Sequence, residues 1–126
     1  MRLISDTQER ARILALGGAI DLHFAPVLRT LLEEPSAVPR KALVLDLSEV
    51  SFIDSSGIAV IIEHLRSAAR RSKAFCIGGM SESVKEIFEI VNLQKAMPVF
   101  ETREAALEAF DQGRIKQPQT LFAPTD

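Results

Sequence analysis

Cysteine is nearly absent from this chain, with one residue, Cys76, among 126. A single cysteine excludes an internal disulfide and any metal site built from several thiolates. Cys76 lies within an apolar run, so we expect a buried and unreactive thiol. The two histidines, His23 and His64, lack the spacing of metal ligands, and no cofactor is predicted.

The chain also lacks an excess of basic charge and a long hydrophobic run. Lys and Arg number 15 against 17 Asp and Glu, a formal net charge of -2 with the two signs interspersed. Nucleic-acid-binding proteins need a basic surface, so nucleic acid is not an expected partner. The N-terminus soon turns polar, and no apolar run reaches the length of a membrane span. We therefore expect a cytoplasmic protein with no membrane insertion.

Motifs of common enzyme classes are missing as well. A nucleophile elbow needs glycine two residues before its serine, and Asp54 holds that position before Ser56. The pairs Gly17-Gly18 and Gly78-Gly79 are not followed by lysine at the spacing of a phosphate-binding loop. His64 is expected on the solvated face of a helix. The sequence thus favours a binding module over an enzyme.

Length and composition predict one globular domain. With 47% hydrophobic residues, 126 residues are enough to bury one core of ordinary size. We expect the folded domain to cover residues 1–110. Residues 111–126, which contain Gly113, Pro118 and Pro124, are expected to form a disordered C-terminal tail.

Apolar periodicity predicts alternating strands and helices. Strands are expected at residues 1–5, 10–16, 42–47, 74–77 and 98–100, with the first two in a hairpin-like pair and glycine turns after the second and fourth. Helices are expected at residues 23–34, over the apolar stripe of residues 58–69, from residue 81 or 83 to 92, and after residue 102. This order indicates an α/β fold with a mixed sheet of four to five strands and about four helices.

Polar residues mark the expected helix ends. Asp21, either Ser81 or Ser83, and Thr102 are predicted N-caps. Asn92 tolerates the left-handed conformation and is predicted to end a helix.

The segment that joins the buried strand at residues 42–47 to the central helix is chemically unusual. Asp54, Ser55 and Ser56 precede a glycine there. Helix N-termini expose unpaired N–H groups and a partial positive charge, so a hydroxyl at this point can cap the helix or accept a phosphate at little electrostatic cost. On local pattern alone, capping is the more ordinary interpretation.

In its surroundings, the segment Phe52–Ile58 resembles the signature of the STAS family, the anti-sigma factor antagonists. Residues 18–21 resemble the turn before the first helix of that family, residues 44–47 its central strand, and residues 77–93 the strand and helix that follow. The resemblance extends from Arg10 to Phe110 and implies a STAS-like fold. Asn92 replaces the usual glycine, and the tail after Phe110 has no counterpart.

The resemblance also implies a phosphorylation switch. In the family, the serine that matches Ser56 is phosphorylated by an anti-sigma factor that is an ATP-dependent serine kinase. The unphosphorylated protein binds that kinase and frees the sigma factor, and a PP2C-type phosphatase reverses the modification. A phosphate adds roughly -1.5 to -2 charges, which disrupts an interface near acidic groups such as Asp21 and Asp54.

The residues carried over from the family as a partner-binding patch are Asp21, Asp54, Ser55, Ser56, Gly57 and Ile58. Ser55 is either a contact residue or only a helix cap, and His23 borders the patch.

Another use of the same fold stays open. STAS-like domains also serve as subunits of lipid-transport ABC complexes or as parts of stress-signalling assemblies, where Ser56 would be a contact residue and not a switch. Arg66, Arg70 and Arg71 form a basic face, but such a face is typical of the solvated side of a helix. The complete Asp-Ser-Ser-Gly motif favours the switch.

Overall fold

A computed structural model describes residues 1–8, 11–33 and 42–112 of the chain. Its strands are β1 (Arg2–Gln8), β2 (Arg12–Ile20), β3 (Ala42–Ile53), β4 (Ala74–Met80) and β5 (Val99–Phe100). Its helices are α1 (Ala25–Leu32), α2 (Ser55–Arg70), α3 (Glu82–Ile90), the short 3-10 helix η1 (Leu93–Lys95) and α4 (Arg103–Asp111). The predicted α/β fold, with a mixed sheet and four α-helices, is confirmed for this part of the chain.

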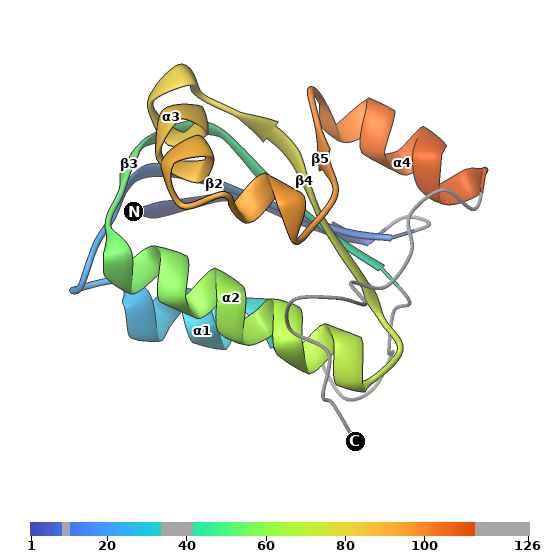
Figure 1. The fold of residues 1–126 in the computed structure, drawn as a ribbon, viewed down its shortest axis with the longest axis horizontal. Coiled ribbons are helices and arrows are strands. Elements are labelled where there is room, and N and C mark those ends of the chain that lie inside the picture. The colour runs from blue at the N-terminus through green and yellow to red at the C-terminus, as the bar shows by residue number, and fades with distance from the viewer. Residues whose placement is uncertain (9–10, 34–41, 113–126) are drawn as a thin grey trace.

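The strands form one sheet in the order β1-β2-β3-β4-β5. β1 and β2 pair antiparallel, as the predicted hairpin requires, and the other neighbours pair parallel. Helices α1, α2 and α3 cover one face of the sheet, and α4 covers the other (Figure 1). The carboxyl ends of β2, β3 and β4 therefore share one edge of the sheet, where binding sites in such folds usually lie.

Strand β3 is the centre of the core. Leu43, Leu45 and Leu47 pack with the helices α1 to α3, whereas Ala42 and Val44 pack with α4 on the opposite face. All five residues are at most 7% exposed. A strand covered on both faces has a continuous apolar run, so the prediction that this strand is buried on both sides is confirmed.

The paired glycines lie inside strands, so the prediction that they form terminating turns was wrong. β2 continues through Gly18, which has a φ of +78°, and β4 continues through Gly79, which has a φ of +109°. The pairing register shifts beside both positions. These glycines form bulges, in which a strand bends without ending.

The predicted helix ends were mostly confirmed. Ser81 accepts a hydrogen bond from the Val84 N–H at 3.3 Å, and Thr102 accepts one from the Ala105 N–H at 3.0 Å. Asn92 has a left-handed φ of +57° after α3. The predicted cap of the first helix was wrong, because the N-cap of α1 is Phe24, which makes no side-chain capping bond.

Two predictions on single side chains had opposite outcomes. Cys76 is fully buried, and burial raises the pKa of its thiol to about 12, which confirms an unreactive cysteine. His64 is not the solvated residue that was predicted. It is partly buried, and its ring meets Phe75 edge-on at a centroid distance of 4.7 Å.

Some predictions fall outside the described residues. The first helix was expected to reach Glu34, but α1 ends at Leu32 and residues 34–41 are not described. The disordered tail was predicted to begin at residue 111, but α4 includes Asp111, so that boundary was wrong; residues 113–126 of the predicted tail are not described. None of the described helices combines the length and the apolar character needed to cross a membrane.

A buried arginine connects the hairpin to α1. Arg12 is 4% exposed, and its guanidinium donates to both carboxylate oxygens of Asp6 at 2.9 Å. The same group donates to the Glu33 carbonyl at 3.2 Å, at the carboxyl end of α1. Because the hydrogen bonds from Arg12 favour the ionised carboxyl, the pKa of Asp6 is below its ordinary value of 3.8.

Replacing Asp6 with asparagine should lower the free energy of unfolding by about 1–3 kcal/mol at pH 7, because Arg12 stays buried and loses its anionic partner. Because the pKa of Asp6 is lower in the folded state than in the unfolded state, its carboxylate stabilises the fold fully at pH values above the unfolded-state pKa. This stabilisation is lost as the pH falls through the folded-state pKa. Urea unfolding should thus show a smaller difference from the parent protein below pH 3.8 than at pH 7. The exposed-carboxylate control Glu89→Gln should change little, and an equal, pH-independent loss in both variants would contradict this role.

Candidate functional site

The predicted site residues come together where β2 and β3 end. Ile20 pairs with Ile53 at the ends of the two parallel strands, and the Asp54 N–H donates to the Ile20 carbonyl at 3.0 Å. Asp21 and Asp54 therefore leave the same edge of the sheet on neighbouring strands. The sequence had placed these two aspartates near each other only through the family resemblance.

Asp54 is the N-cap of α2. Its Oδ1 accepts hydrogen bonds from the Ser56 N–H at 2.9 Å and the Gly57 N–H at 3.1 Å. These bonds satisfy two of the amides that a helix N-terminus leaves unpaired. The sequence left open whether Ser55 caps the helix or contacts a partner. Because Asp54 is the N-cap, Ser55 does not cap α2; it is the first residue of the helix and is exposed.

Ser56 lies at the surface near the start of α2. Ser56 is the second residue of α2 and is partly exposed. Within the part of the chain that the structure describes, its hydroxyl makes no hydrogen bond. No acidic residue occupies the first turn of α2, and the N-cap carboxylate of Asp54 is the anion that complements the partial positive charge of the helix N-terminus.

Gly57 and Ile58 support the site from below. A Cβ atom on Gly57 would lie 2.7 Å from Ile53 Cγ1 and 2.8 Å from Ile20 Cγ2, so only glycine lets α2 start this close to both strands. Ile58 is 7% exposed and belongs to the core. Gly57 and Ile58 are therefore the buried members of the predicted partner-binding patch.

Asp21 organises the turn before α1. Its Oδ1 accepts a hydrogen bond from the His23 N–H at 3.0 Å, and its carbonyl accepts bonds from Phe24 and Ala25, both at 3.0 Å. The carboxylate therefore fixes the turn and does not cap the helix. This turn leaves Leu22 and His23 exposed beside the start of α2.

Three large apolar side chains on the segments that lead to the site are exposed, and sequence reasoning missed them. Leu22 is 71% exposed, Val27 48% and Phe52 47%. Leu22 follows Asp21 directly, Phe52 lies two residues before Asp54, and Val27 lies in the first turn of α1. The closeness of Leu22 and Phe52 to the aspartates in the sequence was the available signal, because exposed large apolar side chains can mark interaction surfaces. We call Leu22, Val27 and Phe52 the apolar rim.

The described residues contain no group of three potential metal ligands. The site consists of the Ser56 hydroxyl, two carboxylates engaged in backbone hydrogen bonds, and the apolar rim.

Comparison with known families decides the membership of the chain. A family model for the STAS domain matches residues 2–106. The chain belongs to the STAS domain family. The resemblance carried by the segment Phe52–Ile58 is thereby confirmed.

Individual relatives of this STAS domain agree with that membership. The anti-sigma-B factor antagonist of Staphylococcus aureus (strain NCTC 8325 / PS 47) is 26% identical over 104 residues, which cover 82% of this chain and 96% of the relative. An anti-sigma factor antagonist from Mycobacterium paratuberculosis has a similar fold, with a TM-score of 0.75, 23% identity and coverage of 86% and 92%. The Bacillus cell fate determinant SpoIIAA, solved in its phosphorylated form, gives a TM-score of 0.62, 18% identity and coverage of 86% and 97%.

Replacing Gly57 with alanine should lower the free energy of unfolding of this STAS domain by about 1–3 kcal/mol, because the new methyl group overlaps Ile20 and Ile53. Chemical denaturation provides the measurement. Ser55→Ala, on the exposed side of the same helical turn, is the matched control and should change stability little. If Gly57→Ala were as stable as the parent protein, the close approach of α2 to the two strands would not be a constraint.

Proposed function

We propose that this STAS domain is an anti-sigma factor antagonist whose binding is switched by phosphorylation of Ser56. Unphosphorylated, it binds an anti-sigma factor that is an ATP-dependent serine kinase, and the sigma factor is freed. Phosphorylation by that kinase abolishes binding, and a PP2C-type phosphatase restores it. The domain comprises residues 1–110, acts in the cytoplasm and is a binding protein, not an enzyme.

The observation that supports this proposal best is the state of the Ser56 hydroxyl. It is accessible and makes no hydrogen bond within the described residues, while the neighbouring Asp54 carboxylate performs the capping. A kinase can therefore modify Ser56 without breaking a bond that holds the helix. Relatives named anti-sigma factor antagonists support the choice of partner.

The surroundings of Ser56 explain how a phosphate would prevent binding. A partner that covers the apolar rim must exclude water from it. A phosphate on Ser56 adds about -1.5 to -2 charges beside the rim, and these charges stay hydrated, so the interface could no longer exclude water. Asp21 and Asp54 already supply negative charge, so a phosphate on Ser56 adds like charge beside them and raises the cost of covering this surface with a partner. The modification changes the surface while the fold persists.

Ser56→Asp should lose the anti-sigma factor kinase that Ser56→Ala retains. The two forms serve as baits in native lysate, captured proteins are identified by mass spectrometry, and phosphorylation of the parent protein by the captured kinase is followed with ATP. Ser55→Ala and Ser55→Asp are matched controls one residue away, and both should retain the kinase.

The competing use of the fold gives a different result. If both Ser56 forms capture the same transporter subunits equally, the domain is a transport subunit and Ser56 is only a contact. If the kinase phosphorylates the Ser56→Ala protein as fast as the parent protein, Ser56 is not the acceptor.

Replacing Phe52 with serine should weaken kinase binding by roughly tenfold, because a large apolar contact at the edge of the site is lost. Leu22→Ser should act similarly. Ile90→Ser removes a side chain that is 79% exposed at the end of α3 and is the matched control, so it should leave the affinity unchanged. Binding would be measured by calorimetry with the purified kinase, and equal losses in all three variants would refute a specific role for the apolar rim.

A further inference from the structure

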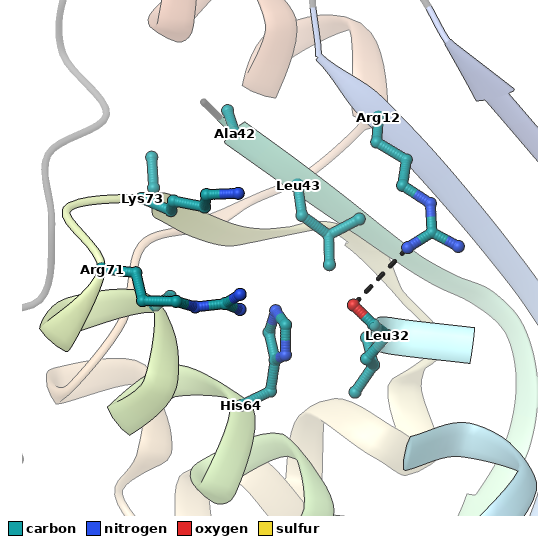
Figure 2. A pocket seen from close by; sticks show the side chains of 9 residues that line it. Arg12, Leu32, Ala42, Leu43, His64, Arg71 and Lys73 are labelled. Atoms are coloured by element: carbon teal, nitrogen blue, oxygen red, sulfur yellow. Dashed lines mark hydrogen bonds between the residues drawn. The ribbon is translucent and has the colours of Figure 1, made fainter. Parts of the chain in front are cut away.

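One face of the sheet is covered over only part of its length. At the amino-terminal ends of the strands, Arg12 of β2 donates to the Leu32 carbonyl of α1 at 3.5 Å (Figure 2), and on the opposite face α4 packs over Ile13. We call this opposite face the α4 face. Nearer the carboxyl end of β3, Glu49 and Phe52 are exposed, so within the described residues α4 does not cover them.

A positive and a negative side chain lie on either side of a glycine in this uncovered part. Arg2, Gly17 and Glu49 pair in one row across β1, β2 and β3. Leu16 belongs to the core under α1 to α3, so Gly17, which follows it in the strand, faces the α4 side. A Cβ atom on Gly17 would lie 3.1 Å from Arg2 Cζ, so the guanidinium lies over the glycine. Because neighbouring strands are about 4.8 Å apart, roughly 10 Å separates the backbones that carry the two charges.

Neither of these two charges is paired within residues 1–8, 11–33 and 42–112. The ion pairs and side-chain hydrogen bonds of the described residues include neither Arg2 nor Glu49. Both residues are exposed. Both charges can therefore meet a second molecule without breaking a bond inside the domain.

Apolar side chains accompany the charges on the same face. Ile4 is 40% exposed, and its Cδ1 would lie 3.0 Å from a Cβ atom on Gly17. Phe52 is 47% exposed and pairs with Ala19, and each of these two residues directly precedes an isoleucine of the core, so both face the α4 side. Exposed apolar side chains that gather on one face mark an interaction surface. We define the open sheet patch as Arg2, Ile4, Gly17, Ala19, Glu49 and Phe52.

The charges of the open sheet patch are complementary to the same patch on a second copy. A copy turned by 180° about an axis parallel to β2 meets the first with Arg2 opposite Glu49 and Glu49 opposite Arg2. Stacked sheets lie about 10 Å apart, a gap that an arginine and a glutamate side chain can bridge together. Gly17, at the centre, has no side chain that would hold the two faces apart.

We propose that the open sheet patch binds a second copy of this chain face to face, in a two-fold symmetric dimer. A partner of a single charge sign would satisfy only one side of the row, whereas the rotated copy satisfies both sides. The apolar side chains exclude water from the contact, and the reciprocal ion pairs set its orientation. Because α4 limits the area that is open, we expect a weak dimer with a dissociation constant of roughly 10–100 μM.

The dimer does not depend on the Ser56 switch. Arg2 and Glu49 do not belong to the predicted partner-binding patch, and α2, which carries Ser56, packs on the opposite face of the sheet. Phe52 belongs to both the open sheet patch and the apolar rim, so within the proposed function dimerisation would keep Phe52 from the kinase. The measurements that follow use no kinase, so the dimer and the switch can fail separately.

Charge reversal tests the reciprocal pairing. Sedimentation velocity of the full-length unphosphorylated protein at low ionic strength should show a reversible monomer–dimer equilibrium between about 5 and 500 μM. Arg2→Glu and Glu49→Arg should each weaken dimerisation at least tenfold, because each variant places like charges opposite one another. Lys85→Glu, an exposed reversal on α3 and so on the opposite face, is the matched control and should dimerise like the parent protein.

Mixing the two variants is the decisive experiment. In a heterodimer of Arg2→Glu with Glu49→Arg, each position 2 again faces an opposite charge at position 49, so an equimolar mixture should associate about as tightly as the parent protein. Exposed substitutions of this kind change stability little, and urea unfolding checks that each variant is folded.

Three outcomes would overturn the proposal. The first is a protein that stays monomeric up to about 500 μM, well above the expected dissociation constant. The second is a dimer that neither reversal weakens, because the copies would then meet through another surface. The third is a mixture of the two folded variants that associates no more tightly than either variant alone.

Discussion

The close approach of α2 to the ends of β2 and β3 is the contact on which the site depends. Gly57 lies against Ile20 and Ile53, and the hydrogen bond from Asp54 to Ile20 joins the two strand ends at the same point. This contact places Ser56 at the surface and leaves the Asp54 carboxylate to pair with helix amides. A side chain at position 57 would push the helix away and move the serine with it.

The two ends of α2 have different physical characters. At its start, the Asp54 carboxylate pairs with two helix amides, and Ser56 and the apolar rim lie at the surface. At its end, the last turn carries Arg70, and Arg71 follows as the C-cap, where basic side chains complement the partial negative charge of the helix. The 16 residues of α2 thus separate the site at its start from the cations at its end.

Sequence reasoning predicted the elements that depend on periodicity and local capping. The stripe on α2, the caps Ser81 and Thr102, and the left-handed Asn92 are local features, and the structure shows all of them. The glycine pairs were misinterpreted, because a bulge depends on how the neighbouring strand pairs and leaves the same local signature as a turn. The burial of His64 and the exposure of Leu22 and Phe52 depend on packing between distant segments, which no local pattern records.

The residues that shape the backbone of the site differ from the residues that the site exposes, and this difference has a consequence for evolution. Gly18, Gly57 and Gly79 hold the backbone in shapes or contacts that larger residues oppose, whereas Leu22 and Phe52 expose much of their surface and bear little of the packing. Substitutions at the exposed positions can accumulate at small cost in folding free energy. Duplicated copies of such a gene could therefore diverge in partner choice by drift at a few surface positions, while the framework that presents the serine is inherited unchanged.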